Sequence, residues 1–288
     1  MKKSIRFIIN PISGVGKKKV LPGLIKQHLD HSKFTYDIVY TSHRGHAVEI
    51  SKEAADEGID IVCVVGGDGS VHEAGTSLIG RNTALAILPT GSGNGIARYL
   101  GLPRRIKSAL KSINAHQIET VDTLTLNGHQ FIGVSGFGFD AYIAKKFDEY
   151  HSRGLTSYAR LVLKEFRKYK GVSVVVNGEK EYSNLFFCSV ANMTQFGNGF
   201  YISPQSDAKD GQFEIVMVRM PKTFGFIGLL FASMRGTLHC SKYVTCIKAK
   251  HAQIKVNDDI GHMDGEPIAL KELTVEFNCH PKSLSVLV

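Results

Sequence analysis

Residues 59–70, Ile-Asp-Ile-Val-Cys-Val-Val-Gly-Gly-Asp-Gly-Ser, decide the fold of this chain. The apolar run at residues 59–65 is typical of a strand buried inside a parallel sheet. It leads into the glycine-rich residues 66–70, and a helix is expected at residues 71–79. Glycines let the backbone approach a ligand closely, and the N-terminus of a helix presents free N–H groups to an anion. The stretch therefore predicts a strand–loop–helix unit that can hold a phosphate.

The same alternation of strand and helix continues through the first part of the chain. Strands are expected at residues 5–9, 36–41, 59–65 and 83–88, and helices at residues 20–29, 47–55, 71–79 and 106–113. This order predicts an α/β domain in which helices flank a parallel sheet. We expect the domain to cover residues 1–122, and the last residues, 281–288, could complete it.

After about residue 121 the pattern changes to short strand-like segments. They lie at residues 123–126, 131–135, 172–176, 185–191, 212–218, 243–249, 252–256 and 273–279. Turn dipeptides such as Asn127-Gly128 separate several of them. The pattern predicts a mostly antiparallel β domain at residues 123–280. Helical patterns at residues 142–169 and 224–234 interrupt it.

Composition is typical of a two-domain globular protein in a reducing compartment. The 288 residues are 43% hydrophobic and 21% charged, which suits two cores. The five cysteines include no CxxC spacing that would indicate zinc or a redox dithiol. The chain starts directly with a strand-like segment, and its most apolar stretch, residues 224–234, is too short to span a bilayer. We expect a cytoplasmic protein.

The net charge of +9 favours anionic partners, such as nucleotide phosphates, acidic lipid headgroups or nucleic acid. The basic residues are spread along the chain, which contains no helix-turn-helix, zinc-finger or aromatic RNA-binding signature. We therefore expect no nucleic-acid partner.

Two further glycine loops follow neighbouring strands. Residues 89–95, Pro-Thr-Gly-Ser-Gly-Asn-Gly, follow the strand at 83–88, and residues 10–17, Asn-Pro-Ile-Ser-Gly-Val-Gly-Lys, follow the first strand. Loops at the ends of neighbouring parallel strands converge on one ligand site. The P-loop pattern does not fit residues 10–17, and GxGxxG fits neither the loop at residues 66–70 nor that at residues 89–95. Asp68 stands out, because a carboxylate at the end of an apolar strand needs a cation or hydrogen-bond donors, although it could also cap the helix that follows.

Residues 66–70 resemble the GGDG(T/S) signature of the diacylglycerol kinase-like lipid kinases, which include sphingosine kinases and bacterial lipid kinases. NAD kinases and phosphofructokinases share this signature, so it indicates the superfamily only. The more specific matches extend the resemblance over essentially the whole chain. They are Asn10-Pro11 with Ser13-Gly14, Leu88-Pro89-Thr90-Gly91-Ser92-Gly93-Asn94, and Ala97-Arg98 with Leu100-Gly101.

The resemblance implies an α/β domain like that of NAD kinases and phosphofructokinases, a C-terminal antiparallel β-sandwich, and an active site in the cleft between them. It implies ATP and Mg²⁺ as cofactors and a lipid alcohol as the acceptor. The residues that would bind ATP are Asn10, Pro11, Ser13, Gly14, Thr41, Gly66, Gly67, Asp68, Gly69, Ser70, Glu73, Thr90, Gly91, Ser92 and Asn94.

The second domain of the family supplies a DGE motif, which is similar to Asp264-Gly265-Glu266. The resemblance implies that one of these carboxylates is, or assists, the general base that takes the proton of the acceptor hydroxyl. Among sphingosine kinases Asp68 would have that role, so the assignment stays open. We favour Asp264 and Glu266 as base and support, with Asp68 organising Mg-ATP, which together meet the needs of phosphoryl transfer. A simple β-turn is the alternative interpretation of the motif.

The acidic loop at residues 207–212 resembles the structural Mg²⁺ site of bacterial members of the family. Asp207, Asp210 and the carbonyl group of Gln212 would be the ligands. Such oxygen ligands suit Mg²⁺, and a solvated acidic turn is the alternative.

The acceptor stays open among diacylglycerol, a sphingoid base, phosphatidylglycerol and other alcohols. Residues 224–234 could line a lipid site or contact the inner face of a membrane, although a core helix explains most of their side chains equally simply. The resemblance is compatible with a homodimer. Two other functions remain: a NAD kinase-like phosphotransferase, and a nucleotide-binding regulator without catalysis, which would not need Asp68, Asp264 and Glu266.

Overall fold

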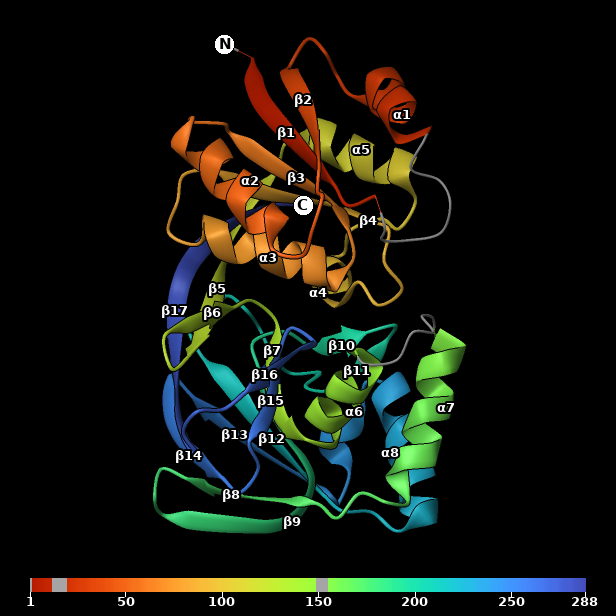
Figure 1. Ribbon diagram of the computed structural model, residues 1–288, viewed down its shortest axis with the longest axis vertical. Coiled ribbons are helices and arrows are strands. Elements are labelled where there is room, and N and C mark those ends of the chain that lie inside the picture. Colours follow the sequence, from red (N-terminus) through yellow and green to blue (C-terminus); the bar gives the residue numbers. More distant parts are fainter. Residues whose placement is uncertain (1, 12–19, 149–154) are drawn as a thin grey trace. The chain divides into compact units, whose positions relative to one another are not determined.

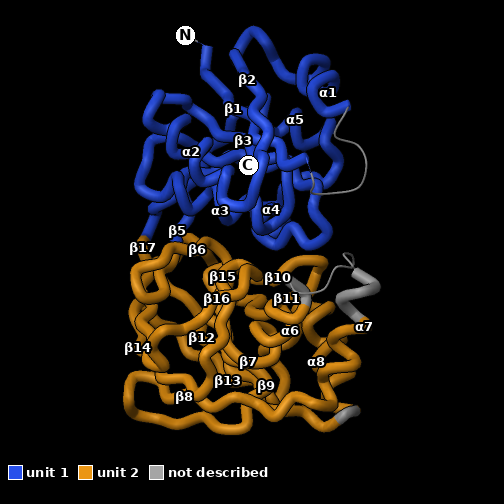
Figure 2. Tube along the Cα trace, in the orientation of Figure 1, with its two compact units in different colours: residues 1–123, 281–288 blue, residues 124–280 orange. Residues whose placement is uncertain are grey.

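The chain forms two compact units in the computed structural model (Figure 2). The structure describes residues 2–11, 20–148 and 155–288. Unit 1 comprises Met1–Thr123 and Pro281–Val288, and unit 2 comprises Leu124–His280. Two strands, β5 (Ile118–Leu126) and β17 (Thr274–Leu287), contain residues of both units, so the chain passes between the units twice.

Unit 1 contains a parallel sheet with the strand order β4-β3-β1-β2 (Figure 1). Its strands are β1 (Lys3–Ile9), β2 (Phe34–Tyr40), β3 (Ile61–Gly66) and β4 (Ala84–Pro89). The end of β17 runs parallel to β4, where Val286 pairs with Leu85. Every residue of β3 and β4 is buried, which explains why both strands are uninterrupted apolar runs.

Helices cover both faces of this sheet. They are α1 (Leu21–His28), α2 (His46–Asp56), α3 (Asp68–Leu78), α4 (Gly95–Tyr99) and α5 (Ile106–Ala115). Successive side chains of a strand point to opposite faces. Phe7, Cys63 and Ala86 therefore share a core with α1 and α5, whereas α2 and α3 pack against the other face (Figure 1).

The strands that lie wholly in unit 2 pair antiparallel. They are β6 (His129–Phe131), β7 (Val134–Gly138), β8 (Val172–Val176), β9 (Lys180–Ala191), β10 (Gln195–Gly197), β11 (Phe200–Tyr201), β12 (Phe213–Arg219), β13 (Val244–Ala249), β14 (His251–Val256), β15 (Ile260–Met263) and β16 (Glu266–Ala269). Phe131, Phe137, Phe213 and Phe277 are fully buried in one core of this unit. Edge contacts between these rings pack the interior.

A second core of unit 2 lies under its helices. These are α6 (Phe139–Asp148), α7 (Leu155–Phe166), α8 (Thr223–Met234) and the short 3₁₀ helix η2 (Leu238–Cys240). Phe139, Phe186 and Phe226 are buried in this core, where Phe186 stacks on Phe139. In the parts of the chain that the structure describes, no helix is both long enough and apolar enough to cross a membrane.

Three local features differ from the sequence prediction. The helix expected at residues 71–79 begins at Asp68, because Gly69 and Ser70 belong to its first turn. The helical stretch expected at residues 142–169 contains two helices, α6 and α7, and residues 149–154 lie outside the described parts. Asp264-Gly265 joins two strands, β15 and β16, that the sequence analysis did not identify.

Candidate functional site

The two glycine loops at the carboxyl ends of β3 and β4 touch each other. The carbonyl oxygen of Gly66 accepts hydrogen bonds from the N–H groups of Thr90 (2.9 Å) and Gly91 (3.2 Å). A Cβ atom built on Gly91 would lie 2.5 Å from the Cα atom of Gly67, and one built on Gly67 would lie 3.1 Å from the Cα atom of Gly91. The two backbones can approach this closely because Gly91 has no side chain, and a side chain on Gly67 would also be tightly placed. The predicted convergence of these loops is therefore observed.

Asp68 links the first loop to the helix after the second. It is the first residue of α3, and the N-cap residue of that helix is Gly67. Its Oδ1 atom accepts a hydrogen bond of 2.6 Å from the N–H group of Gly95, the first residue of α4. A Cβ atom on Gly93 would lie 2.7 Å from Oδ2 of Asp68, so the second loop passes directly over the carboxylate.

The second loop is held by its own side chains. Asn94 has a positive φ of 52° and is buried; its side chain accepts from the N–H group of Gly91 and donates to the Gly91 carbonyl. Arg98 donates to the carbonyl oxygen of Gly93 at 3.0 Å. The Thr90 hydroxyl is buried and has no hydrogen-bond partner among the described residues. An unpartnered buried donor in such a loop, beside backbone N–H groups, fits the phosphates of a nucleotide.

The remaining predicted nucleotide-binding residues lie on neighbouring elements of unit 1. Asn10, after β1, donates to the hydroxyl group of Ser70 at 3.3 Å, which ties the first strand to α3. Glu73 of α3 accepts from the N–H group of Gly45 at 2.9 Å. Thr41 is buried directly after β2. Pro11 and Ser92 are exposed, and Ser13 and Gly14 lie outside the described residues.

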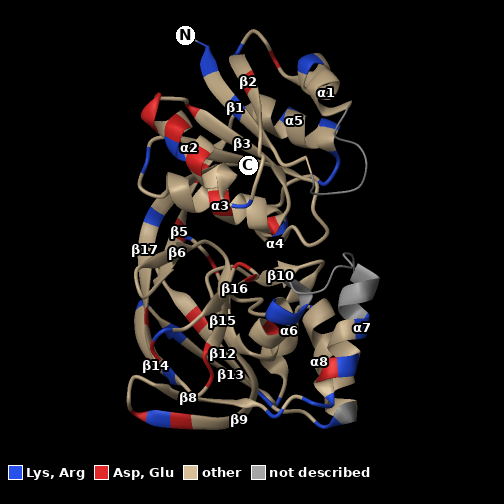
Figure 3. Ribbon diagram, viewed as in Figure 1, with Lys and Arg blue, Asp and Glu red and all other residues tan. Residues whose placement is uncertain are grey.

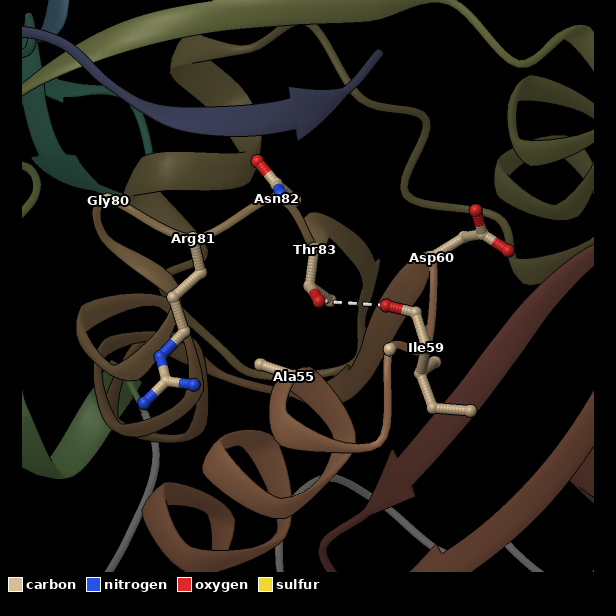
Figure 4. A pocket seen from close by; sticks show the side chains of 8 residues that line it. Ala55, Ile59, Asp60, Gly80, Arg81, Asn82 and Thr83 are labelled. Atoms are coloured by element: carbon tan, nitrogen blue, oxygen red, sulfur yellow. Dashed lines mark hydrogen bonds between the residues drawn. The ribbon is translucent and has the colours of Figure 1, made fainter.

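A surface hollow lies at the opposite end of the strands of the same sheet (Figure 4). Asp60 and Thr83, which line it, stand directly before β3 and β4, and Thr83 donates to the carbonyl oxygen of Ile59. It is therefore at the amino ends of the strands, whereas ligands of open α/β sheets bind at the carboxyl ends. The hollow is separate from the glycine loops.

In unit 2, Asp264-Gly265 forms a two-residue hairpin turn. Both residues have positive φ, 50° and 86°, and Met263 pairs with Glu266 across the turn, as in a type I′ hairpin. The Asp264 carboxylate accepts three hydrogen bonds from the backbone segment before and at the start of β7. The donors are the N–H groups of Ile132 (3.0 Å), Gly133 (2.7 Å) and Val134 (3.1 Å). Asp264 therefore anchors the hairpin, and Glu266 is the first residue of β16, partly buried.

Three side chains that the sequence analysis missed lie beside this hairpin. Asp140, in the first turn of α6, accepts hydrogen bonds from the Ser189 hydroxyl (2.8 Å) and pairs with His262 Nε2 (3.2 Å). His262 is in β15, two residues before Asp264. A sequence signal existed in residues 136–140, where glycines alternate with phenylalanines across the end of β7 and an acidic residue, Asp140, follows in the first turn of α6. Glycines within a strand often mark a close approach of another group.

The acidic loop at residues 207–212 is joined to β13 by an ion pair that the sequence analysis did not predict. The Asp210 carboxylate accepts from the N–H group of Gln212 (2.9 Å) and lies 2.7 Å from Nζ of Lys248. The hydrogen bond that the Lys248 ammonium group donates to Asp210 raises the pKa of Lys248. Asp207 accepts from the N–H group of Lys209. No cluster of three or more His, Cys, Asp or Glu side chains suited to a metal occurs within the described ranges, and the predicted set contains only two carboxylates.

Comparison with known families covers almost the whole chain. Residues 4–126 match the diacylglycerol kinase catalytic domain, and residues 133–288 match the YegS C-terminal NAD kinase beta sandwich-like domain. A diacylglycerol kinase of Bacillus subtilis is 26% identical over 92% of this chain and 90% of its own length. A diacylglycerol kinase of Mycobacterium tuberculosis is 27% identical over 98% of this chain and 94% of its own length.

Solved structures share the fold. The crystal structure of a diacylglycerol kinase from Bacillus anthracis matches with a TM-score of 0.71 and 20% identity over 99% of this chain and 96% of its own. An NAD kinase from Archaeoglobus fulgidus in complex with ATP matches with a TM-score of 0.53 and 11% identity, over 99% and 93% of the two chains. These likenesses confirm the expected α/β domain and C-terminal antiparallel β-sandwich. The two domain matches and the named relatives establish that the chain belongs to the diacylglycerol kinase-like family of lipid kinases and is, by that membership, a phosphotransferase.

Proposed function

We propose that the protein transfers the γ-phosphate of Mg-ATP to a hydroxyl group of a lipid, such as diacylglycerol or a sphingoid base. The observation that carries this proposal is the joining of two glycine loops at the carboxyl ends of β3 and β4, with Asp68 bound to the start of α4. The family supports a lipid acceptor, and two relatives of similar length are named diacylglycerol kinase.

The phosphates of ATP would be held by backbone N–H groups of the two loops and by the Thr90 hydroxyl. Since that hydroxyl has no partner in the described parts of the chain, it can donate to a phosphate oxygen without breaking an existing bond. Asp68 would hold Mg²⁺ beside the phosphates. The metal, when bound, neutralises the phosphate charge that otherwise repels an incoming hydroxyl oxygen.

Glu266 is our choice for the general base, with Asp264 as the residue that holds the hairpin. A carboxylate can accept about four hydrogen bonds, and that of Asp264 already accepts three from backbone N–H groups. The two side chains would thus have different roles in the DGE motif. Asp264 would fix the turn, and Glu266 would take the proton of the acceptor hydroxyl while the hydroxyl oxygen attacks the γ-phosphorus and the bond from that phosphorus to the leaving ADP breaks.

The exposed face of α8 would place the protein on the surface of an anionic membrane. Phe224 is 89% exposed, and Ile227, Phe231 and Met234 are also exposed at positions that recur on one face of the helix. Lys222 and Arg235 flank this apolar face at its two ends, where they can contact acidic headgroups. Lys and Arg occur in both units rather than on one element (Figure 3), so the apolar face, not charge alone, would select the contact.

The loop at residues 207–212 would hold a structural Mg²⁺ through Asp207, Asp210 and the Gln212 carbonyl group. Its oxygen donors suit this ion. Lys248 is a competing cation at Asp210, so the ion would have to displace its ammonium group.

The proposed reaction is tested by measuring ADP formation and lipid phosphorylation with purified protein, ATP and Mg²⁺. Diacylglycerol, a sphingoid base, phosphatidylglycerol and NAD would each be offered as acceptors. Asp68→Asn and Glu266→Gln keep size and shape, and both should lower kcat at least about 100-fold. Glu272→Gln, which changes an exposed carboxylate between β16 and β17, is the matched control.

Lipid-dependent turnover that is lost in both variants and kept in the control would support the proposal. Turnover with NAD alone would replace it with the NAD kinase-like alternative. ATP binding without turnover on any acceptor would favour a nucleotide-binding regulator.

A further inference from the structure

A buried acidic group lies directly beneath the Asp264-Gly265 hairpin. Asp140 and His262 have side chains that are only 11% and 3% exposed, and their Oδ2 and Nε2 atoms are 3.2 Å apart. The same Oδ2 atom accepts a hydrogen bond of 2.8 Å from Ser189, while Oδ1 accepts from the N–H group of Ala141. The proposed reaction, as described above, uses none of these side chains.

The hydrogen bonds define one tautomer of His262. The N–H group of Gly265 donates to Nδ1 at 3.4 Å, so Nδ1 carries the lone pair. The proton is therefore on Nε2, where it is donated to the Asp140 carboxylate. A chain of contacts thus runs from α6 through the imidazole to the backbone of the hairpin, one residue before Glu266.

This cluster is not a nucleophilic serine site. The Ser189 hydroxyl is fully buried and donates to Asp140 rather than to the imidazole. The cluster is also closely packed: a Cβ atom on Gly136 would lie 2.6 Å from Oδ2 of Asp140 and 2.9 Å from the Ser189 hydroxyl oxygen. Gly136 therefore leaves space for a fixed arrangement of polar groups.

We infer that Asp140 and His262 are positioning residues for phosphoryl transfer, an inference that rests on the proposed function and on the role of Glu266 in it. Asp140 fixes the tautomer and orientation of His262, and His262 fixes the N–H group of Gly265. Gly265 directly precedes Glu266, so its orientation sets the start of β16 and the direction of the Glu266 side chain. Misplacing a reacting group by about 1 Å costs about 100-fold in rate.

Two substitutions of His262 separate its two contacts. In His262→Asn the amide oxygen reaches the place of Nδ1 and can accept from Gly265, but the side chain is too short for Asp140. In His262→Gln the amide reaches the place of Nε2 and can donate to Asp140, but the contact with Gly265 is lost. We expect kcat to fall about 10- to 100-fold in His262→Gln and less than about threefold in His262→Asn.

The thermal midpoint, Tm, should rank the two variants in the opposite order, with His262→Gln more stable than His262→Asn. His262→Asn leaves the buried Asp140 carboxylate without one donor and should therefore have the lower Tm. A purely structural role for His262 predicts that kcat and Tm fall together in the same variant, and that result would overturn the inference, as would equal kcat in both variants.

Asp140→Asn provides a second test, read by ¹⁵N NMR of the imidazole. An amide NH₂ facing Nε2 must donate to it, which moves the histidine proton to Nδ1, opposite the N–H group of Gly265. We expect this tautomer together with a kcat loss of about 10- to 100-fold. An unchanged kcat in a variant whose ¹⁵N spectrum shows the histidine proton on Nδ1 would overturn the inference while leaving the kinase intact. Absence of any lipid-dependent turnover by the unmodified protein would instead overturn the proposed function, and this inference with it.

Discussion

Gly67 and Gly91 are in direct backbone contact, with no space for a methyl group on Gly91 and only a tight fit for one on Gly67. The contact joins the loop after β3 to the loop after β4, so both loops keep a fixed shape before any ligand arrives. A site of this kind is preorganised, and preorganisation lowers the cost of binding.

Gly91→Ala should destabilise unit 1 by about 1–3 kcal/mol, because the added methyl group overpacks the loop contact. It should also weaken ATP binding by more than the loss of stability explains, because the methyl group pushes the loop after β4 away from the loop after β3. Differential scanning calorimetry and ATP titration would measure the two effects.

Gly23→Ala is the matched control for that change. Gly23 lies within α1 with no atom close to the position of an added Cβ, so alanine should stabilise the helix by about 0.5–1 kcal/mol. Equal stability and equal ATP affinity in Gly91→Ala and the unmodified protein would show that the loop contact is unimportant.

Asp264 and Glu266 should respond differently to substitution. Asp264→Ala leaves three backbone N–H groups without their acceptor and places alanine at positive φ, so it should cost at least about 2 kcal/mol of unfolding free energy. Glu266→Gln should change stability by less than about 0.5 kcal/mol. Urea unfolding of both variants would measure this.

Asp264→Gly separates the effect of backbone strain from that of the lost acceptor, because glycine tolerates positive φ. If Asp264→Gly and Asp264→Ala were both as stable as the unmodified protein, the carboxylate would not anchor the hairpin.

Phe224→Ser and Phe231→Ser should each weaken binding to vesicles that contain anionic phospholipid by about 10-fold, since each removes apolar surface that would leave water. Sedimentation with vesicles would measure the change. Leu273→Ser, an exposed apolar residue outside α8, should leave binding unchanged. An equal loss in the Leu273 variant, or none in the phenylalanine variants, would contradict the proposed membrane contact.

Mg²⁺ added without nucleotide should raise Tm if the loop at residues 207–212 holds the ion, and Asp210→Asn should abolish the rise. Lys248→Gln removes the competing ammonium group, so it should shift the Mg²⁺ dependence to lower concentrations. Differential scanning fluorimetry across a Mg²⁺ series would measure both. A Tm that is independent of Mg²⁺ in all three proteins would rule out a structural ion.

The sequence predicted elements that short-range patterns define, and it missed contacts between distant residues. The buried runs of β3 and β4 were recognisable because a parallel sheet covered on both faces requires continuous apolar strands. The start of α3 was placed three residues too late, because Gly69 has low helix propensity and tertiary contacts overrode it.

In the candidate site, too, the sequence showed the residue types but not the contacts between distant residues. The glycines and carboxylates stood out as residue types, but the sequence did not show that Asp68 accepts a hydrogen bond from Gly95, the first residue of α4. Asp140 and His262 are 122 residues apart, so no local period links them. Contacts of this kind depend on which strands become neighbours in the sheet, and the pattern of a single sequence does not reveal that pairing.

Because β17 returns to unit 1, the order in which the ribosome synthesises the chain differs from the order of the two units. Leu284, Val286 and Leu287 are buried in unit 1, and Gly80 donates to the carbonyl group of Ser283. These residues are translated only after all of unit 2. Unit 1 begins the chain, but its sheet lacks this strand until the end of synthesis, whereas unit 2 is continuous in sequence and is synthesised before it. Domains generally fold N-terminal first during synthesis, whereas here the N-terminal unit receives its last strand at the very end of synthesis.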